Sequence, residues 1–460
     1  MRYLLRSLAA ATLLALPAVA GAQSVESFAH GVPAGHASSE PIALSLREAV
    51  ARGLERNLGV ILEEQRLKGT ESARAAALSE LLPRLSGSVR KSDQVLSTAA
   101  FGFTLPGLPT LIGPFGLFDA RLSLSAPLFD ARGFGALRSG RAEVRAGQAS
   151  VQDIRDAVVL AVGTLYLQAE AGAARVDSAR AQVATAEALV QVARDQQAAG
   201  LVAGIDVLQQ QVQLQAAQAR VIAAENTFEK SKLSLARAIG LPAGQSFTLA
   251  DTTTFIPSPP TTLDAAVRVA EANRADLRAA QARVEAARAE RQAEAAGRLP
   301  TVHLEADVGA IGPAAASADR TYSVAAVARV PLFEGGNIRA RVQRADAELH
   351  AREAELADVT VGLHYEIEQA LLDIKAADAG VAVADRAREL SRQELEQAED
   401  RFRAGVSNTL ELVQAQENVA TANEQYIASV YAHAIAKASF VRATGQVEQQ
   451  LVAVVEGAQP

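Results

Sequence analysis

The chain has 460 residues, of which 49% are hydrophobic but only 4% aromatic, and it contains no tryptophan and no cysteine. Its 45 basic and 52 acidic side chains are interspersed, with a formal net charge of −7, so no basic surface for nucleic acid is expected. The lack of cysteine excludes disulfides and thiolate metal sites. The alanine-rich apolar fraction favours helices in close contact.

The N-terminal residues predict export from the cytoplasm. Arg2 and Arg6 precede a short apolar stretch, and Ala20-Gly21-Ala22 fits a signal-peptidase site, so residues 1–22 are expected to be a signal peptide. Residues 23–45 are rich in Gly, Ser and His and are expected to be mobile. No later stretch reaches the ~18 uninterrupted apolar residues of a membrane helix, so any membrane-spanning part must consist of β-strands.

An internal repeat organises the rest of the chain, because Leu46–Pro83 aligns without a gap with Leu263–Pro300. The first copy, residues 46–262, is expected to hold a helix, a β-hairpin at 84–128, a long helix at 134–199, a turn at 200–205, a helix at 205–240 and a proline-rich connector at 241–262. The second copy, residues 263–445, is expected to hold a helix, a hairpin at 301–331, a long helix at 336–404, a turn at 405–408 and a helix at 409–444. Residues 446–460 are expected to form a C-terminal tail.

Both hairpins show period-2 alternation of apolar and polar residues, as in Val302, Leu304 and Ala306 against the intervening polar positions. A strand of a water-filled membrane barrel and a half-buried sheet of a soluble protein both produce this pattern. Four strands cannot close a bacterial barrel, which needs at least about eight. Together with export, this favours the hypothesis that three protomers pool their strands into a twelve-stranded barrel.

The long helices carry apolar residues at 3,4 spacing, which is typical of a coiled-coil seam. A soluble coiled coil or a bundle core would show the same seam. The two shorter helices of each copy together nearly match the long helix in length, which favours a wall of parallel helices. The fold class is therefore mixed α and β, with a long helical barrel above a four-stranded sheet.

This arrangement resembles the TolC-like outer-membrane efflux proteins, including the OprM type. The resemblance rests on the paired motifs Leu82-Pro83 and Leu299-Pro300, and Pro127-Leu128-Phe129 and Pro331-Leu332-Phe333. It also rests on two turns that read Gly-Leu-Val-Ala-Gly-Ile-Asp at 200–206 and Gly-Val-Ser-Asn-Thr-Leu-Glu at 405–411. The resemblance implies an outer-membrane homotrimer with its helices in the periplasm, a periplasmic adaptor protein and an inner-membrane transporter as partners, and the export of small molecules or polypeptides.

The resemblance also assigns roles to the two turns. The adaptor-contacting tip would comprise Gly200, Leu201, Val202, Gly405, Val406 and Ser407. The gate of the pore would comprise Asp206, Phe402, Glu411 and Gln414. Phe402 and Ser407 stand where the family often has tyrosine and arginine, so closure is expected to depend more on apolar packing. Acidic residues in a first helical turn also favour the helix dipole, which is a purely structural alternative for Asp206 and Glu411.

No pattern indicates an enzyme or a bound cofactor. The six histidines have no ligand spacing, and no phosphate-binding loop or nucleophile-elbow motif occurs. Two other functions fit an exported, hairpin-rich chain: a periplasmic coiled-coil adaptor and a structural coiled coil of the cell envelope. The doubled hairpin layout favours a passive outer-membrane conduit of a tripartite efflux or secretion system over both.

Overall fold

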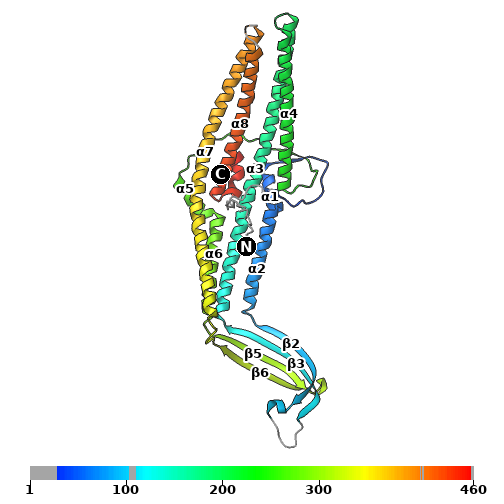
Figure 1. Ribbon diagram of the computed structural model, residues 1–460, viewed down its shortest axis with the longest axis vertical. Coiled ribbons are helices and arrows are strands. Elements are labelled where there is room, and N and C mark those ends of the chain that lie inside the picture. Colours follow the sequence, from blue (N-terminus) through cyan, green and yellow to red (C-terminus); the bar gives the residue numbers. More distant parts are fainter. Residues whose placement is uncertain (1–27, 29, 103–109, 405, 407–408, 457–460) are drawn as a thin grey trace, which may run out of the picture.

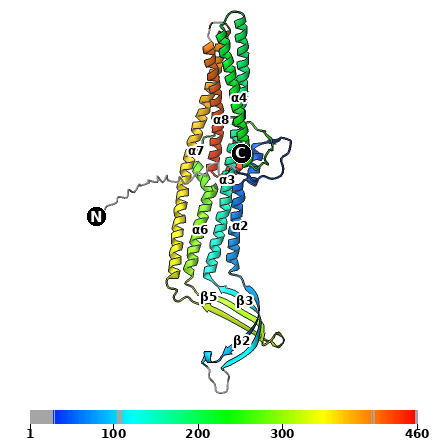
Figure 2. The ribbon, with the colours of Figure 1, turned by 45° about the vertical axis from the view of Figure 1, so that its right-hand side comes forward.

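The structure, a computed structural model, describes residue 28 and residues 30–102, 110–404, 406 and 409–456. The expected signal peptide at 1–22 and the tip residues Gly405 and Ser407 lie outside this part. Figure 1 shows a long rod of helices with a single sheet attached at one end. Two helices run the whole length of the rod, and Figure 2 shows the shorter ones aligned beside them.

The part of the chain that the structure describes contains nine α-helices, of which two are very long and seven are shorter. The full-length helices are α3 (Ala131–Ala198, 68 residues) and α7 (Asn337–Arg403, 67 residues). The shorter helices are α1 (Leu46–Arg56), α2 (Leu58–Ser79), α4 (Gly204–Ala238), α5 (Leu263–Asn273), α6 (Ala275–Ala296), α8 (Thr409–Ala443) and α9 (Val447–Glu456). Helices α3 and α8 form the contact between the antiparallel pair α3/α4 and the antiparallel pair α7/α8.

The structure divides the first helix expected in each copy into two. Asn57 separates α1 from α2 with an extended backbone (φ −65°, ψ 131°), and Arg274 separates α5 from α6 in the same way. The Asn57 side chain caps α2 by accepting the Gly59 N–H at 2.9 Å, and it also donates to the carbonyl oxygens of Phe28 and Ala238. The buried Arg274 guanidinium binds two carboxylates instead, those of Asp276 and Glu366. Tertiary partners therefore interrupt both helices.

The sheet contains four antiparallel strands in the order β2-β3-β5-β6. They are β2 (Arg84–Ser97), β3 (Leu111–Phe129), β5 (Thr301–Gly312) and β6 (Asp319–Arg329). Pairing of β3 with β5 joins the two hairpins, and β2 and β6 form the edges. The register confirms the alternation seen in the sequence: Leu85, Leu124, Ala306 and Val324 form one row across the sheet, and the neighbouring row is Ser86, Ser123, Asp307 and Ser323.

The middle of the rod carries most of the apolar core. Strand β1 (Ile42–Leu44) pairs in parallel with β4 (Phe247–Leu249), so this part of the segment expected to be mobile is held in a sheet. The expected C-terminal tail contains α9, whose Leu451 is 1% exposed and packs in the same core. Tyr166 of α3 is equally buried and donates its hydroxyl to the Leu44 carbonyl oxygen at 3.0 Å. The core thus ties both ends of the described chain to α3.

Helix α3 is also apolar enough, by length and composition, to cross a membrane. However, 72% of its most apolar 18-residue window is buried inside the protein. Val158, Val162 and Leu167 of this stretch pack in the apolar core of the middle of the rod. Its hydrophobicity is therefore accounted for by packing.

Candidate functional site at the distal helical end

The candidate site is the distal end of the rod, defined as the two turns that join α3 to α4 and α7 to α8, together with the last helical turns around them. Figure 1 shows the ends of α3, α4, α7 and α8 that flank these turns at the opposite end of the rod from the sheet. Both contain residues for which the sequence predicted contact with an adaptor or closure of a pore.

Gly200 ends α3 with a left-handed backbone (φ +70°). The Gly200 N–H binds the Gln197 carbonyl oxygen at 3.0 Å, and the Leu201 N–H binds that of Gln196 at 2.9 Å. This pair of bonds is the Schellman motif, which a residue with a side chain adopts only at a cost in free energy. Leu201 then projects into solvent with 70% of its surface exposed, while Val202 is half-buried. The turn therefore presents an apolar side chain at the tip.

The second turn presents a similar surface in its described part. The Val406 N–H binds the Arg401 carbonyl oxygen at 3.1 Å, and the Val406 side chain is 68% exposed. Ile205 and Leu410, which follow the two turns, are also largely exposed. Each tip thus exposes apolar side chains at the protein surface.

Phe402 lies inside the protomer, where the two helix pairs meet. Its side chain is 2% exposed and packs in a cluster that we call the distal cluster, composed of Leu189, Ala193, Val207, Ala398, Phe402, Leu412 and Ala415. These residues come from α3, α4, α7 and α8. Phe402 was predicted to belong to a pore gate, and in this protomer it forms an apolar contact between the two helix pairs.

Two hydrogen bonds accompany the distal cluster. The Thr409 hydroxyl donates to the Asp206 carboxylate at 2.6 Å, and the Gln196 amide donates to the Phe402 carbonyl oxygen at 3.0 Å. Asp206 also accepts the Ala203 N–H at 3.0 Å, so its carboxylate both caps α4 and holds the start of α8. Neither Thr409 nor Gln196 was predicted to have a role, because no local sequence pattern indicates a hydrogen bond between residues about 200 positions apart.

The two other predicted gate residues lie on the first turns of α8. Glu411 forms an ion pair with Arg401 at 3.1 Å, and both side chains are about half exposed. Gln414 is exposed and donates to Asn418 at 3.1 Å. The structure thus brings Asp206 and Phe402 to the contact between the helix pairs, while Glu411 and Gln414 lie at the surface of the protomer.

A Ser-His-Asp grouping in the middle of the rod resembles a hydrolytic triad only in composition. Ser258 Oγ and Asp378 Oδ1 lie 3.2 and 2.9 Å from the same ring nitrogen, Nε2 of His433. A catalytic histidine must use one nitrogen for the nucleophile and the other for the carboxylate. Burial lowers the pKa of His433, and its contacts tie the connector to α7 and α8. No cluster of three metal-ligating side chains occurs in the part of the chain that the structure describes.

Comparison with known proteins agrees with this architecture. A profile of the outer membrane efflux protein family matches residues 52–241 and 266–446. The pyoverdine export outer membrane protein OpmQ of Pseudomonas putida is 28% identical over 322 residues, covering 67% of this chain and 66% of OpmQ, slightly under two thirds of that relative.

Solved structures match over most of the chain. The outer-membrane channel OprN has a TM-score of 0.74 at 21% identity, covering 87% of this chain and 90% of OprN. VceC of Vibrio cholerae, an outer membrane protein, also has a TM-score of 0.74, at 18% identity, covering 87% of this chain and 96% of VceC. These likenesses show the same fold of long helices and a short sheet, and the family profile covers most of the chain. The chain therefore belongs to the outer membrane efflux protein family.

Proposed function

We propose that this chain is the outer-membrane channel of a tripartite efflux or secretion system, with its helical rod in the periplasm. The observation that carries the proposal is the exposed apolar face of the sheet. Val89, Tyr322 and Val324 are 74%, 82% and 68% exposed on this face, so their side chains are not covered within the protomer. Lipid provides that cover in a membrane barrel, whose outward positions are apolar and whose inward positions are polar.

A homotrimer follows from the edges of the sheet. Strands β2 and β6 each have one neighbour, and an open edge in lipid would leave backbone groups without hydrogen bonds. Pairing β6 of one protomer with β2 of the next would close twelve strands in a trimer. The helices offer exposed apolar side chains at similar distances from the distal end, namely Ile222 on α4 and Val383 on α7. Figure 1 shows α4 and α7 on opposite sides of the distal half of the rod.

The proposed trimer also uses an internal repeat, in which the two halves of each protomer have similar helices. Helices α1 and α5 both have 11 residues, α2 and α6 both have 22, and α4 and α8 both have 35. The family profile matches each half separately. Two similar halves in each of three protomers would give a near six-fold helical tube beneath the barrel.

The exposed tips are the surface proposed to contact a periplasmic adaptor, which would link the channel to an inner-membrane transporter. This surface comprises Gly200, Leu201, Val202, Gly405, Val406 and Ser407, of which Leu201 and Val406 are exposed apolar side chains in the described part. The transported class is proposed to be small molecules or polypeptides. Asp206, Phe402, Glu411 and Gln414 are proposed to hold the periplasmic end of the pore closed.

The deciding experiment is a planar-bilayer recording on the purified protein, with its mass in detergent measured in parallel. Discrete conductance from a species with the mass of a trimer is the expected result. A soluble monomer without conductance would refute the channel and favour a periplasmic coiled-coil protein. Extraction from the outer membrane only by detergent separates the channel from both an adaptor and a structural coiled coil.

A further inference from the structure

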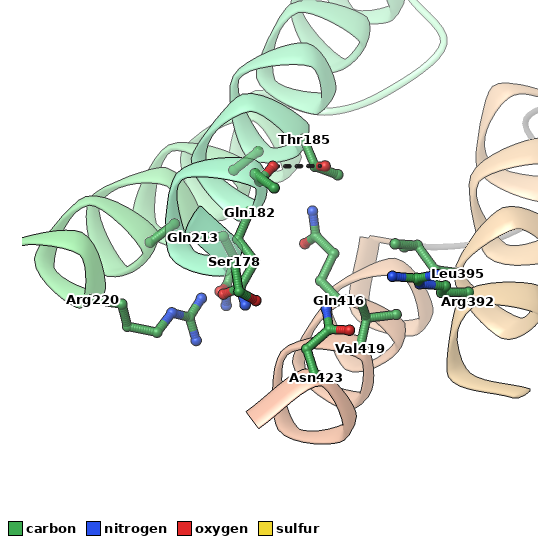
Figure 3. A pocket seen from close by; sticks show the side chains of 13 residues that line it. Ser178, Gln182, Thr185, Gln213, Arg220, Arg392, Leu395, Gln416, Val419 and Asn423 are labelled. Carbon is green, nitrogen blue, oxygen red and sulfur yellow. Dashed lines mark hydrogen bonds between the residues drawn. The ribbon is translucent and has the colours of Figure 1, made fainter. Parts of the chain in front are cut away.

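A cavity of about 210 Å³ lies between the two helix pairs, on the side of the distal cluster nearer the sheet. Figure 3 shows side chains from α3, α4, α7 and α8 converging on it. Its wall mixes apolar residues such as Leu395 and Val419 with serine, threonine, glutamine, asparagine and arginine.

The charged residues of the wall are all positive. Arg220 of α4 and Arg392 of α7 line the cavity, and no aspartate or glutamate does. Figure 3 shows the two arginines on opposite sides of the cavity. Arg220 binds Glu417 at 3.0 Å through Nη1, but its Nε is buried without a hydrogen-bond partner. Arg392 is exposed at the rim of the cavity and forms no ion pair with a carboxylate of the described residues.

The neutral wall residues also have unused hydrogen-bonding capacity. The amide oxygens of Gln182 and Gln416 are buried and have no partner within the described part of the protein. Folded proteins rarely leave such atoms unsatisfied, since each costs free energy. The oxygen and nitrogen of a carboxamide can exchange places by rotation, so both side chains can equally donate N–H groups into the cavity.

The two arginines need an occupant that accepts hydrogen bonds, and the rotated amides can donate to the same occupant. Water could satisfy the amides, but it would leave Arg392, which has no carboxylate partner among the described residues, without a counter-charge. Carboxylate and phosphate groups match guanidinium geometry and form the strongest hydrogen bonds with it. We propose that this cavity is a binding site for a small carboxylate- or phosphate-bearing molecule, held by Arg220 and Arg392 with the amides of Gln182 and Gln416. The proposal does not depend on the channel function.

The test is calorimetric titration of the full-length protein in detergent with citrate and, separately, with inorganic phosphate, both at constant low ionic strength. We expect saturable binding of at least one anion, weakened by added sodium chloride because screening reduces attraction between exposed charges. Tighter binding of citrate assigns a carboxylate ligand, and tighter binding of phosphate assigns a phosphate ligand. If neither anion binds saturably, the cavity holds only water and the proposal is overturned.

Two variants locate the binding. Arg392→Gln removes one guanidinium from the exposed rim of the cavity and should weaken binding at least about tenfold. Arg194→Gln removes the same charge from an exposed position on α3 outside the cavity and should leave the affinity unchanged. Equal affinities of Arg392→Gln and the wild type would place the anion elsewhere and refute the site. Gln182→Leu provides a second, uncharged test and should also weaken binding.

Discussion

Replacing Glu170 with glutamine is expected to change how the stability of this protein depends on pH. Glu170 of α3 is 3% exposed, and its carboxylate accepts the Thr253 hydroxyl at 2.5 Å while the other oxygen has no hydrogen-bond partner. The pKa of Glu170 is raised from 4.5 to about 7. Burial is the largest cause, the hydrogen bond from Thr253 opposes it, and the nearby charge of Asp251 adds to it. The carboxyl group therefore prefers its neutral form in the folded protein.

The sign and size of this pH effect follow from the difference in the pKa of Glu170 between the folded and unfolded states. Because the pKa of the folded state is raised, the contribution of Glu170 to stability is fully present below pH 4.5 and is lost as the pH rises through 7. The loss amounts to about 3 kcal/mol per protomer. Glutamine stays neutral, so Glu170→Gln should gain about this much relative to the wild type between pH 4.5 and pH 8.

The assay is unfolding of wild type and variant in detergent, followed by circular dichroism at several pH values. Any cost of the new amide N–H group is the same at every pH, so only the pH-dependent part of the difference reports on ionisation. Glu187→Gln, an exposed change on the same helix, is the matched control. A difference between Glu170→Gln and wild type that stays constant from pH 5 to pH 8 would refute the reasoning.

Three further predictions concern the distal end and the sheet. Phe402→Ala should cost about 3–5 kcal/mol and speed hydrogen exchange in the distal helices, whereas Phe134→Ala, at a side chain 53% exposed, should cost far less. Val324→Arg on the apolar face of β6 should reduce membrane insertion by about 2–4 kcal/mol, measured as the fraction of heat-modifiable trimer, while Ser323→Arg on the other face should be tolerated. Glu411→Ala should reduce cation selectivity in single-channel recordings, and unchanged conductance and selectivity would remove Glu411 from the gate.

Local sequence patterns were sufficient to predict the strands and turns that are determined by residues close together in the sequence. The alternation of Val302, Leu304 and Ala306 predicted a strand, and these residues lie opposite Ala328, Ala326 and Val324 in the sheet. Gly200, the first residue of the turn motif read from the sequence, has the left-handed backbone that ends a helix. In these places the burial pattern or the turn geometry acts within a few residues of chain.

Features that depend on distant partners were not predicted. The break at Asn57 requires Phe28 and Ala238, and the break at Arg274 requires Glu366. Three-residue strands such as β1 are too short to produce a period-2 signal. The bond from Thr409 to Asp206 likewise joins two segments that have no common local pattern.

Three contacts in the middle of the rod, which together we call the belt, join residues 42–57 to residues 238–251 and have a consequence for the order of folding. The Asn57 side chain needs the Ala238 carbonyl oxygen, the Leu46 N–H binds the Asp251 carboxylate at 2.6 Å, and β1 needs β4. Each of these contacts spans about 200 residues, so none can form until more than half of the chain has left the translocation machinery. Because the chain is exported with its N-terminus first, it cannot complete the belt early. The first exported segment therefore remains accessible to chaperones, and assembly of the protomers is delayed until the whole first copy of the repeat has been exported.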